Sequence, residues 1–147
     1  MSDEHARALL AEAIKVAKNA YNPRSLFGVG AAVRTKKGNI YHGVNVESVI
    51  SGLGTCGERN ALDTMCTNGE YEAVAIAVAC PSGLHHPCGA CIQYIFEFAQ
   101  VGKFDIEIIY GNYAGEYKTT TVQTLLPGCF GPATSGDKYN LDRFRTP

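Results

Sequence analysis

Apolar residues recur at helical spacing over the first twenty positions of the chain. Their single stripe predicts an amphipathic helix over residues 3–20, and it consists of Leu9, Leu10, Ala13, Ile14, Ala17 and Tyr21. Asn22-Pro23 ends this helix. Two apolar runs follow at 27–35 and 39–46, joined by the turn Lys37-Gly38-Asn39. This arrangement predicts a β-hairpin.

The second half of the chain alternates runs typical of strands and of helices. Apolar and β-branched runs predict strands at 71–80, 104–110 and 116–122. Helices are expected at 55–67 and 88–101, and a short one at Leu125-Leu126 before Pro127-Gly128. Thr55-x-x-Glu58 has the form of a capping box at the start of the first of these helices.

The resulting order of elements, α-β-β-α-β-α-β-β, predicts a layered α/β domain. Such an order gives a mixed sheet covered by helices. No internal repeat or linker divides the chain, so a single domain is expected over 1–147. The segment 131–147 is rich in Gly, Pro, Ser and charge, which predicts a loosely ordered tail.

Composition and charge narrow the class of protein. The chain has 147 residues, of which 46% are apolar and 18% charged, and a net charge of −1, so it is a globular domain with no electrostatic case for binding nucleic acid. No apolar run reaches the ~18 residues of a membrane span. The N-terminus MSDEHARALLAEA contains acidic residues and is not a secretory signal. A cytoplasmic location is therefore expected, where clustered cysteines indicate metal binding or catalysis more often than disulfides.

Two compact, glycine-spaced segments hold three of the six cysteines. They are Thr55-Cys56-Gly57-Glu58-Arg59 and Pro87-Cys88-Gly89-Ala90-Cys91. Cys88 and Cys91 can place two sulfurs on one ion, and Cys56 supplies a third, which leaves the fourth position of a tetrahedral zinc for water. Both segments lie at predicted helix N-termini, where the thiolate form is stabilised. The other cysteines, Cys66, Cys80 and Cys129, are expected to be small buried residues.

The glutamate and arginine beside the first cysteine complete this pattern. Glu58 lies near the metal without being forced to bind it, and a carboxylate there can take a proton from a zinc-bound water and pass it on. Three thiolates give a zinc site a charge of −1, for which Arg59 is the natural compensating cation. A Cys₃ site with a nearby glutamate and P-C-x-x-C is the arrangement of zinc deaminases.

Simpler interpretations remain open from the residues alone. Cys88-x-x-Cys91 could be a redox pair, and a structural zinc could take a fourth ligand from His85 or His86. Otherwise those two histidines are ordinary loop residues. Glu58 could serve only in the capping box.

The sequence resembles the cytidine deaminase family over most of its length. The matching segments are FGVGAAV (27–33), Asn45-Val46-Glu47, Cys56-Gly57-Glu58-Arg59, Pro87–Cys91 with Gln93, and 125–130. The resemblance implies a three-layer α-β-α fold with a mixed five-stranded sheet, and one Zn(II) per chain held by Cys56, Cys88 and Cys91. It also implies hydrolytic deamination of cytidine or deoxycytidine in pyrimidine salvage, with Glu58 moving protons from water to the ring nitrogen and the leaving amine.

The resemblance also assigns the substrate-binding positions. Asn45 and Glu47 would hold the ribose hydroxyls, and their spacing of two places them on one face of a strand. Phe27 and Gly57 would line the nucleoside pocket, and Phe130 would reach the base from a neighbouring subunit of a homotetramer. Asn45 and Glu47 could instead simply end a strand, and both phenylalanines could belong to the core.

Several positions depart from the family pattern around the pocket. Arg24 and Ser51 replace usual tyrosines, Gly57 replaces an alanine, and Ile92 replaces an arginine. The zinc chemistry is unaffected, but the pocket wall at Ser48–Ser51 is changed. A deaminase of another aminated heterocycle, such as blasticidin S, therefore stays open, as does a zinc-stabilised binding or redox module without turnover.

Overall fold

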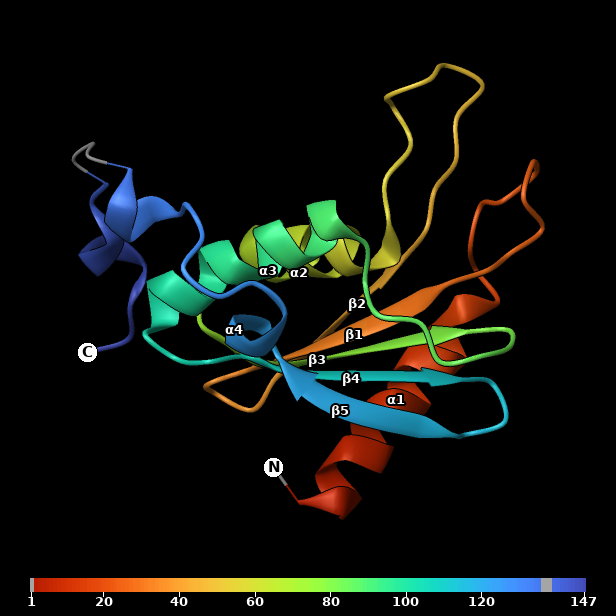
Figure 1. Ribbon diagram of the computed structural model, residues 1–147, viewed down its shortest axis with the longest axis horizontal. Helices are drawn as coiled ribbons and strands as arrows, with labels where there is room; N and C mark the ends of the chain where they lie inside the picture. The colour runs from red at the N-terminus through yellow and green to blue at the C-terminus, as the bar shows by residue number, and fades with distance from the viewer. Residues whose placement is uncertain (1, 136–138) are drawn as a thin grey trace.

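A computed structural model describes residues 2–135 and 139–147 of the chain (Figure 1). Its centre is a five-stranded sheet in the order β2-β1-β3-β4-β5. The strands are β1 (Gly30–Thr35), β2 (Ile40–Val44), β3 (Ala73–Cys80), β4 (Glu107–Asn112) and β5 (Tyr117–Thr121). β3 and β4 run parallel, and all other neighbours are antiparallel. The predicted hairpin and mixed sheet are therefore confirmed.

Helices cover both faces of this sheet. Helix α1 (Asp3–Ala17) lies on one face, and helices α2 (Gly57–Thr67) and α3 (Gly89–Gly102) lie side by side on the other (Figure 1). β3 alternates between the two cores: its alanines at 75, 77 and 79 face α1, while Ile76 and Val78 face α2 and α3. The sheet is buried on both sides at its centre, which confirms the three-layer α-β-α architecture.

The first helix and the first strand are shorter than predicted. α1 ends at Ala17, and Tyr21 is exposed and forms an isolated bridge with Val46 instead of continuing the apolar stripe. β1 begins at Gly30. The residues before it are held largely by the Asn45 side chain, whose Nδ2 donates to Phe27 O (3.0 Å) and whose Oδ1 accepts from Val29 N (2.8 Å), with one backbone bond from Asn45 N to Val29 O (3.1 Å).

The predicted capping box at the start of α2 is wrong. The N-cap is Cys56, with no side-chain capping bond, so Thr55 lies outside the helix and Glu58 is its second residue. α3 begins in the same way, with Cys88 as an N-cap whose side chain makes no capping bond. Both thiols are thus left available at helix N-termini.

A glycine on β2 lets helix α2 approach the sheet closely. A Cβ at Gly43 would lie 2.2 Å from Ala61 N and 2.3 Å from Gly57 O, both backbone atoms of α2. No side chain fits between the two elements at this point. The close approach fixes the end of the helix that carries Cys56 and Glu58.

The chain after β5 runs back over α3. It contains α4 (Val122–Leu125) and two 3₁₀ helices, Pro132–Thr134 and Leu141–Phe144. Near the C-terminus, Arg145 Nε donates to Val101 O (2.6 Å) and Thr146 N donates to Glu72 Oε2 (2.6 Å). Residues 136–138, within the tail predicted to be loosely ordered, lie outside the described residues.

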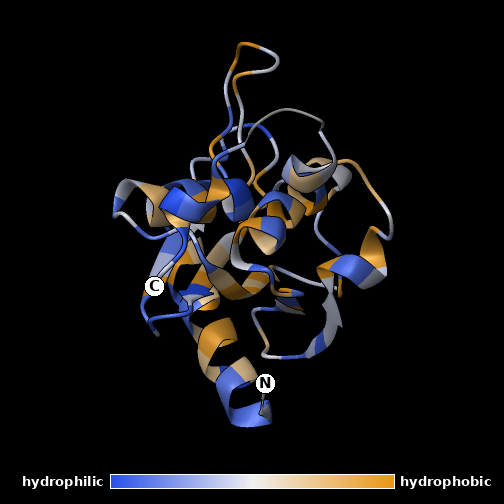
Figure 2. Ribbon diagram, turned by 90° about the vertical axis from the view of Figure 1, so that its left-hand side faces the viewer, coloured by the Kyte–Doolittle hydropathy of each residue, from blue (hydrophilic) through white to orange (hydrophobic). Residues whose placement is uncertain are grey.

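A long loop between β2 and α2 projects from the body of the protein (Figure 1). The ribbon of this loop carries hydrophobic colouring toward its tip (Figure 2), and Val49 is 93% exposed and Leu53 68% exposed. Across the described ranges 2–135 and 139–147, we find no helix with the length and apolar character needed to cross a membrane.

Candidate active site and metal centre

Three thiols meet where helices α2 and α3 begin. The sulfur atoms of Cys56, Cys88 and Cys91 all lie within 4.8 Å of one another, and Cys56 Sγ is 3.8 Å from Cys88 Sγ. Two sulfurs bound tetrahedrally at about 2.3 Å from one zinc would be about 3.8 Å apart. The donor set and its spacing therefore fit a zinc ion.

This cluster contains three ligands and no histidine. Within the described part of the chain it is the only group of three or more metal-ligating side chains found, and His85 and His86 lie outside it. Structural zinc sites close with four protein ligands, whereas catalytic sites keep one position open. The arrangement thus favours an open site over a structural one.

Helix α2 also supplies a cation to the thiols. Arg59 Nη2 lies 3.6 Å from Cys56 Sγ and donates to it. The pKa of Cys56 is lowered to about 5, first by its interaction with Cys91 and then by Arg59, against the opposing effect of burial. The pKa of Cys91 is raised, because it shares its proton with Cys56 and is buried. The surroundings thus favour the thiolate form at Cys56.

Glu58 is a buried carboxyl group beside the thiols. Its exposed fraction is only 4%, and burial raises its pKa, which its interaction with Cys91 partly offsets. A carboxyl group whose pKa is raised toward neutrality can both accept and give up a proton. Its position suits a proton carrier next to the metal centre.

Cys56 and Glu58 open into one cavity of about 390 Å³. Phe27, Val29 and Asn45 line one side of it, Cys56, Gly57 and Glu58 lie at the start of α2, and the remaining lining residues are Val78, Cys80, His85, His86, Pro87 and Gly111. The volume falls in the range of pockets for small molecules. The structure thus brings together the predicted residues Phe27, Asn45, Cys56, Gly57 and Glu58.

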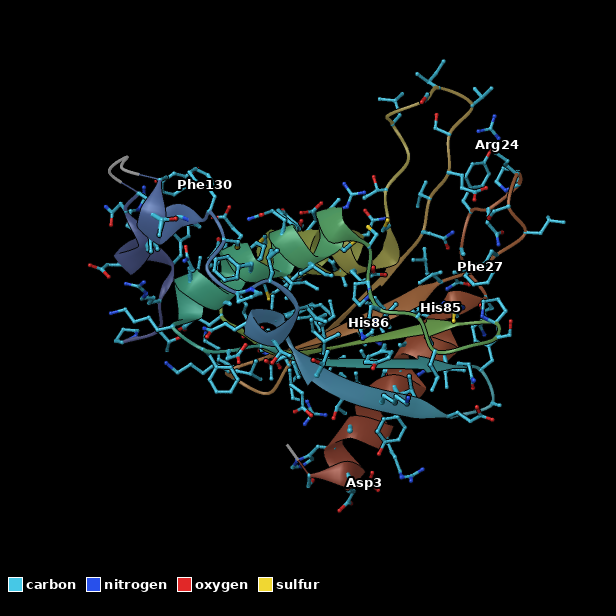
Figure 3. The ribbon with its side chains drawn as sticks, in the orientation of Figure 1. Asp3, Arg24, Phe27, His85, His86 and Phe130 are labelled. Carbon is cyan, nitrogen blue, oxygen red and sulfur yellow. The ribbon has the colours of Figure 1, made fainter. Side chains whose placement is uncertain are left out.

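Glu47 lies next to this cavity without lining it. Its Oε1 accepts hydrogen bonds from the backbone N–H groups of Arg24 (2.9 Å) and Ser25 (3.1 Å). The pKa of Glu47 is lowered, mainly by hydrogen bonding from the Ser25 side chain. Glu47 and Asn45 thus hold the segment that carries Phe27 at the edge of the cavity (Figure 3).

Phe130 lies away from the cavity of its own chain. It is 68% exposed and lines a different hollow with Arg59, Gln93 and Tyr94. Phe27 and His85 lie toward one end of the molecule, His86 lies nearer its middle, and Phe130 lies toward the other end (Figure 3). Within one subunit, therefore, Phe130 does not join the other predicted site residues.

The sequence interpretation missed part of the pocket wall. His85 and His86 were expected to be ordinary loop residues and Cys80 a small buried residue, yet all three line the cavity with Glu58. Cys80 is indeed buried. One signal for the two histidines was available in the sequence: they directly precede Pro87-Cys88. A loop that leads into a metal-binding helix must border the metal, so its side chains are candidates for the pocket wall.

A cavity with a buried carboxyl group beside an open three-thiol centre defines a zinc-type hydrolytic site, and comparisons with known proteins agree. Residues 3–106 match the family model for the cytidine and deoxycytidylate deaminase zinc-binding region. The chain belongs to this cytidine deaminase family. A cytidine deaminase of Halalkalibacterium halodurans is 40% identical over 123 residues, which are 83% of this chain and 91% of that protein.

Two further relatives cover a similar part of the chain. A cytidine deaminase of Sporosarcina psychrophila is 40% identical over 83% of this chain and 88% of its own length. The crystal structure of the cytidine deaminase from Burkholderia pseudomallei superimposes with a TM-score of 0.78 at 38% identity, covering 88% of this chain and 100% of that one. The similarity therefore includes both the fold and the segments that hold the cysteines.

Proposed function

We propose that this protein is a zinc-dependent hydrolytic deaminase that converts cytidine and deoxycytidine to uridine and deoxyuridine, with release of ammonia. The observation that carries the proposal is that Glu58 and Cys56 line one cavity with Phe27 and Asn45, and that Cys88 and Cys91 complete the thiol cluster around Cys56. Relatives at 40% identity are named cytidine deaminases, which supports the same reaction here.

Cys56, Cys88 and Cys91 would hold one zinc ion per chain, and Arg59 would offset the negative charge of the thiolates. The ion supplies a Lewis acid that lowers the pKa of water to about 7. Glu58 would take one proton from the attacking water and deliver it to N3 of the ring while the water oxygen bonds to C4. It would then pass the proton of the new C4 hydroxyl group to the amine, which leaves as ammonia when its bond to C4 breaks. The burial of Glu58 keeps bulk water from competing for that proton.

Asn45 and Glu47 would orient the ribose. Each has bonds to the segment 24–29 already, but an amide oxygen has two lone pairs and a carboxylate about four acceptor sites. Ribose hydroxyl groups could therefore bond to both residues without displacing that segment. Phe27, on the same segment, would pack against the nucleoside.

We also propose that the protein is a homotetramer with shared active sites. The exposed apolar residues of the loop 46–54, and Phe130 at a distance from its own cavity, support an assembly in which one subunit completes the site of another. A cytoplasmic location belongs to the same proposal, because reduced thiols persist in a reducing compartment.

The test is ammonia release by purified protein of known zinc content, with product identification by mass, on cytidine, deoxycytidine, cytosine and blasticidin S. We expect turnover of the two nucleosides with zinc near one per chain. Cys88→Ser should lose both zinc and turnover, whereas Cys129→Ser, outside the cluster, should keep both. Turnover of blasticidin S alone, or zinc without turnover of any nucleoside, would contradict the proposal.

A further inference from the structure

The loop that leads from β3 into α3 places two imidazole rings in the wall of the cavity. His85 and His86 line it together with Glu58 (Figure 3). The ring of His86 lies against the ring of Tyr110, with centroids 4.4 Å apart and an angle of 37° between the planes. Tyr110 is only 7% exposed and belongs to the core between the sheet and α3. The imidazole of His86 therefore rests on a rigid support.

The ring of His85 lies close to the backbone of the same loop. Gly83 has a φ of +80°, and a Cβ at this position would lie 2.5 Å from His85 Nε2. Only glycine accepts both the positive φ and this close contact. The His85 ring thus lies close to Gly83, and the His86 ring is supported on one face by Tyr110, while both side chains remain exposed enough to meet a ligand.

The order of the strands gives the distance between Asn45 and the part of the cavity wall formed by His85 and His86. The cavity runs from Asn45, just after β2, to Gly111 on β4. In the order β2-β1-β3-β4 these strands are three spacings apart, or about 14 Å. A nucleoside with its ribose at Asn45 and its base directed toward β4 would reach the part of the cavity where Tyr110 supports His86.

The orientation of the base then decides which of its atoms meets His86. Deamination requires C4, its amine and N3 to face Glu58 and the thiols. C4 has two neighbours in the ring, N3 and C5. With N3 facing Glu58, the other neighbour, C5, lies on the opposite flank of C4. A base oriented for reaction thus presents its C5 edge to the imidazole wall.

We propose that His86 determines specificity for the group at C5 of the pyrimidine. A hydroxymethyl group there would form a hydrogen bond with an imidazole nitrogen. A methyl group would cover that nitrogen without pairing with it, which disfavours the analogue. This inference rests on the proposed function, because it takes its base orientation from the deamination reaction.

The test compares kcat/KM for cytidine, 5-methylcytidine and 5-hydroxymethylcytidine. We expect the wild-type protein to favour the hydroxymethyl over the methyl compound by about tenfold, the effect of one hydrogen bond. His86→Leu should bring this ratio close to one, while His86→Gln, which still forms hydrogen bonds, should retain most of it. His5→Leu, on the exposed surface of α1, is the matched control. Binding of 5-hydroxymethyluridine and 5-methyluridine, measured by calorimetry, should follow the same order.

The outcomes separate this inference from the proposed function. Cytidine turnover with an unchanged ratio in His86→Leu would overturn the role of His86 and leave the deaminase intact. A wild-type preference for the methyl compound would overturn it even if the variants failed to fold. Absence of cytidine turnover by the wild-type protein would overturn both.

Discussion

Arg59 Nη2 lies 3.6 Å from Cys56 Sγ, while Nε of the same guanidinium is buried and has no hydrogen-bond partner among the described residues. The arginine thus places its charge on the thiol cluster at the cost of an unpaired donor. The free-energy cost of the unpaired donor is offset where the guanidinium balances a strong negative charge, such as that of three thiolates around a divalent ion. The relationship supports the proposal that Arg59 offsets the charge of the metal centre.

Arg59→Gln should weaken zinc binding by about 10- to 100-fold, the usual effect of changing a residue that contacts a metal ligand. The physical reason is that the pKa of Cys56 rises toward its ordinary value when the guanidinium is removed, so protons compete better with zinc. Competition with a chromogenic chelator measures the effect. Arg34→Gln is the matched control, because Arg34 also has a buried, unpaired Nε but lies outside the cysteine cluster. Equal zinc affinity in wild type and Arg59→Gln would contradict the role.

Glu58→Gln should lower kcat by at least about 10²- to 10⁴-fold, the usual contribution of a positioned acid–base group. Glutamine preserves size and fills the same buried space, so zinc content should remain that of the wild type. Glu97→Gln is the control, since burial raises the pKa of Glu97 as well, but Glu97 lines the other hollow with Phe130. Loss of zinc in Glu58→Gln would show that Glu58 is a ligand.

The sequence predicted the layers of the fold well because apolar periodicity is a local signal. It also predicted the cluster of three cysteines, because their spacing within each segment is local. It failed where a tertiary contact decides the local structure. Tyr21 continues the apolar stripe of α1 in the sequence, yet it forms a β-bridge with Val46. Thr55 has the sequence pattern of a capping box, yet the N-cap position of α2 is Cys56. His86 gave no local signal of its contact with Tyr110, which is 24 positions away in the sequence and becomes its neighbour only when β4 joins the sheet.

Gly43→Ala should destabilise the protein by about 1–3 kcal/mol or more, since an added methyl group would overlap the backbone of α2. The helix would have to move away from β2, and it carries Cys56 and Glu58, so zinc affinity should fall together with stability. Urea denaturation and zinc titration measure the two effects. Gly89→Ala is the control, because a Cβ there meets no atom within 4 Å. A stable Gly43→Ala protein with normal zinc binding would contradict the close packing.

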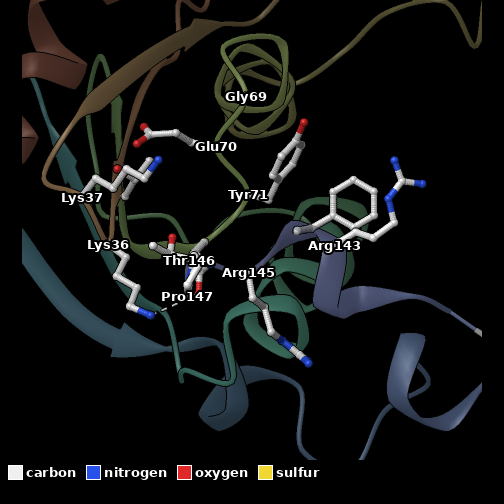
Figure 4. A pocket seen from close by; sticks show the side chains of 12 residues that line it. Lys36, Lys37, Gly69, Glu70, Tyr71, Arg143, Arg145, Thr146 and Pro147 are labelled. Carbon is white, nitrogen blue, oxygen red and sulfur yellow. Dashed lines mark hydrogen bonds and ion pairs between the residues drawn. The ribbon is translucent and has the colours of Figure 1, made fainter.

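A hollow near the C-terminus, lined among others by Lys36, Glu72 and Thr146, provides a prediction about pH (Figure 4). Burial alone would raise the pKa of Glu72, but hydrogen bonds from Thr146 and Lys36 outweigh it, so the pKa is lowered. A lowered pKa in the folded state stabilises the protein above the unfolded value, about 4.3, and this stabilisation is lost as the pH falls through the folded value.

Glu72→Gln should therefore cost roughly 1 kcal/mol at neutral pH, the difference between a charged and a neutral acceptor. The deficit should stay constant down to about pH 5 and shrink below about pH 4. Urea midpoints across this range give the measurement, with the exposed Glu4→Gln as control. A deficit that persists unchanged at the lowest pH would rule out the carboxylate as its source.

The exposed position of Phe130 leads to a test of shared active sites by subunit mixing. If Phe130 completes the pocket of a neighbouring subunit, Phe130→Ala should lower kcat/KM for cytidine by about tenfold or more, through the loss of aromatic packing. A protein co-expressed from Phe130→Ala and Glu58→Gln chains should recover activity, because intact Glu58 of one chain meets intact Phe130 of the other. The recovery should exceed the sum of the two separate variants in a cytidine deamination assay. If the mixture shows only that sum, and light scattering shows mixed oligomers, each subunit works with its own residues and the shared-site arrangement is wrong.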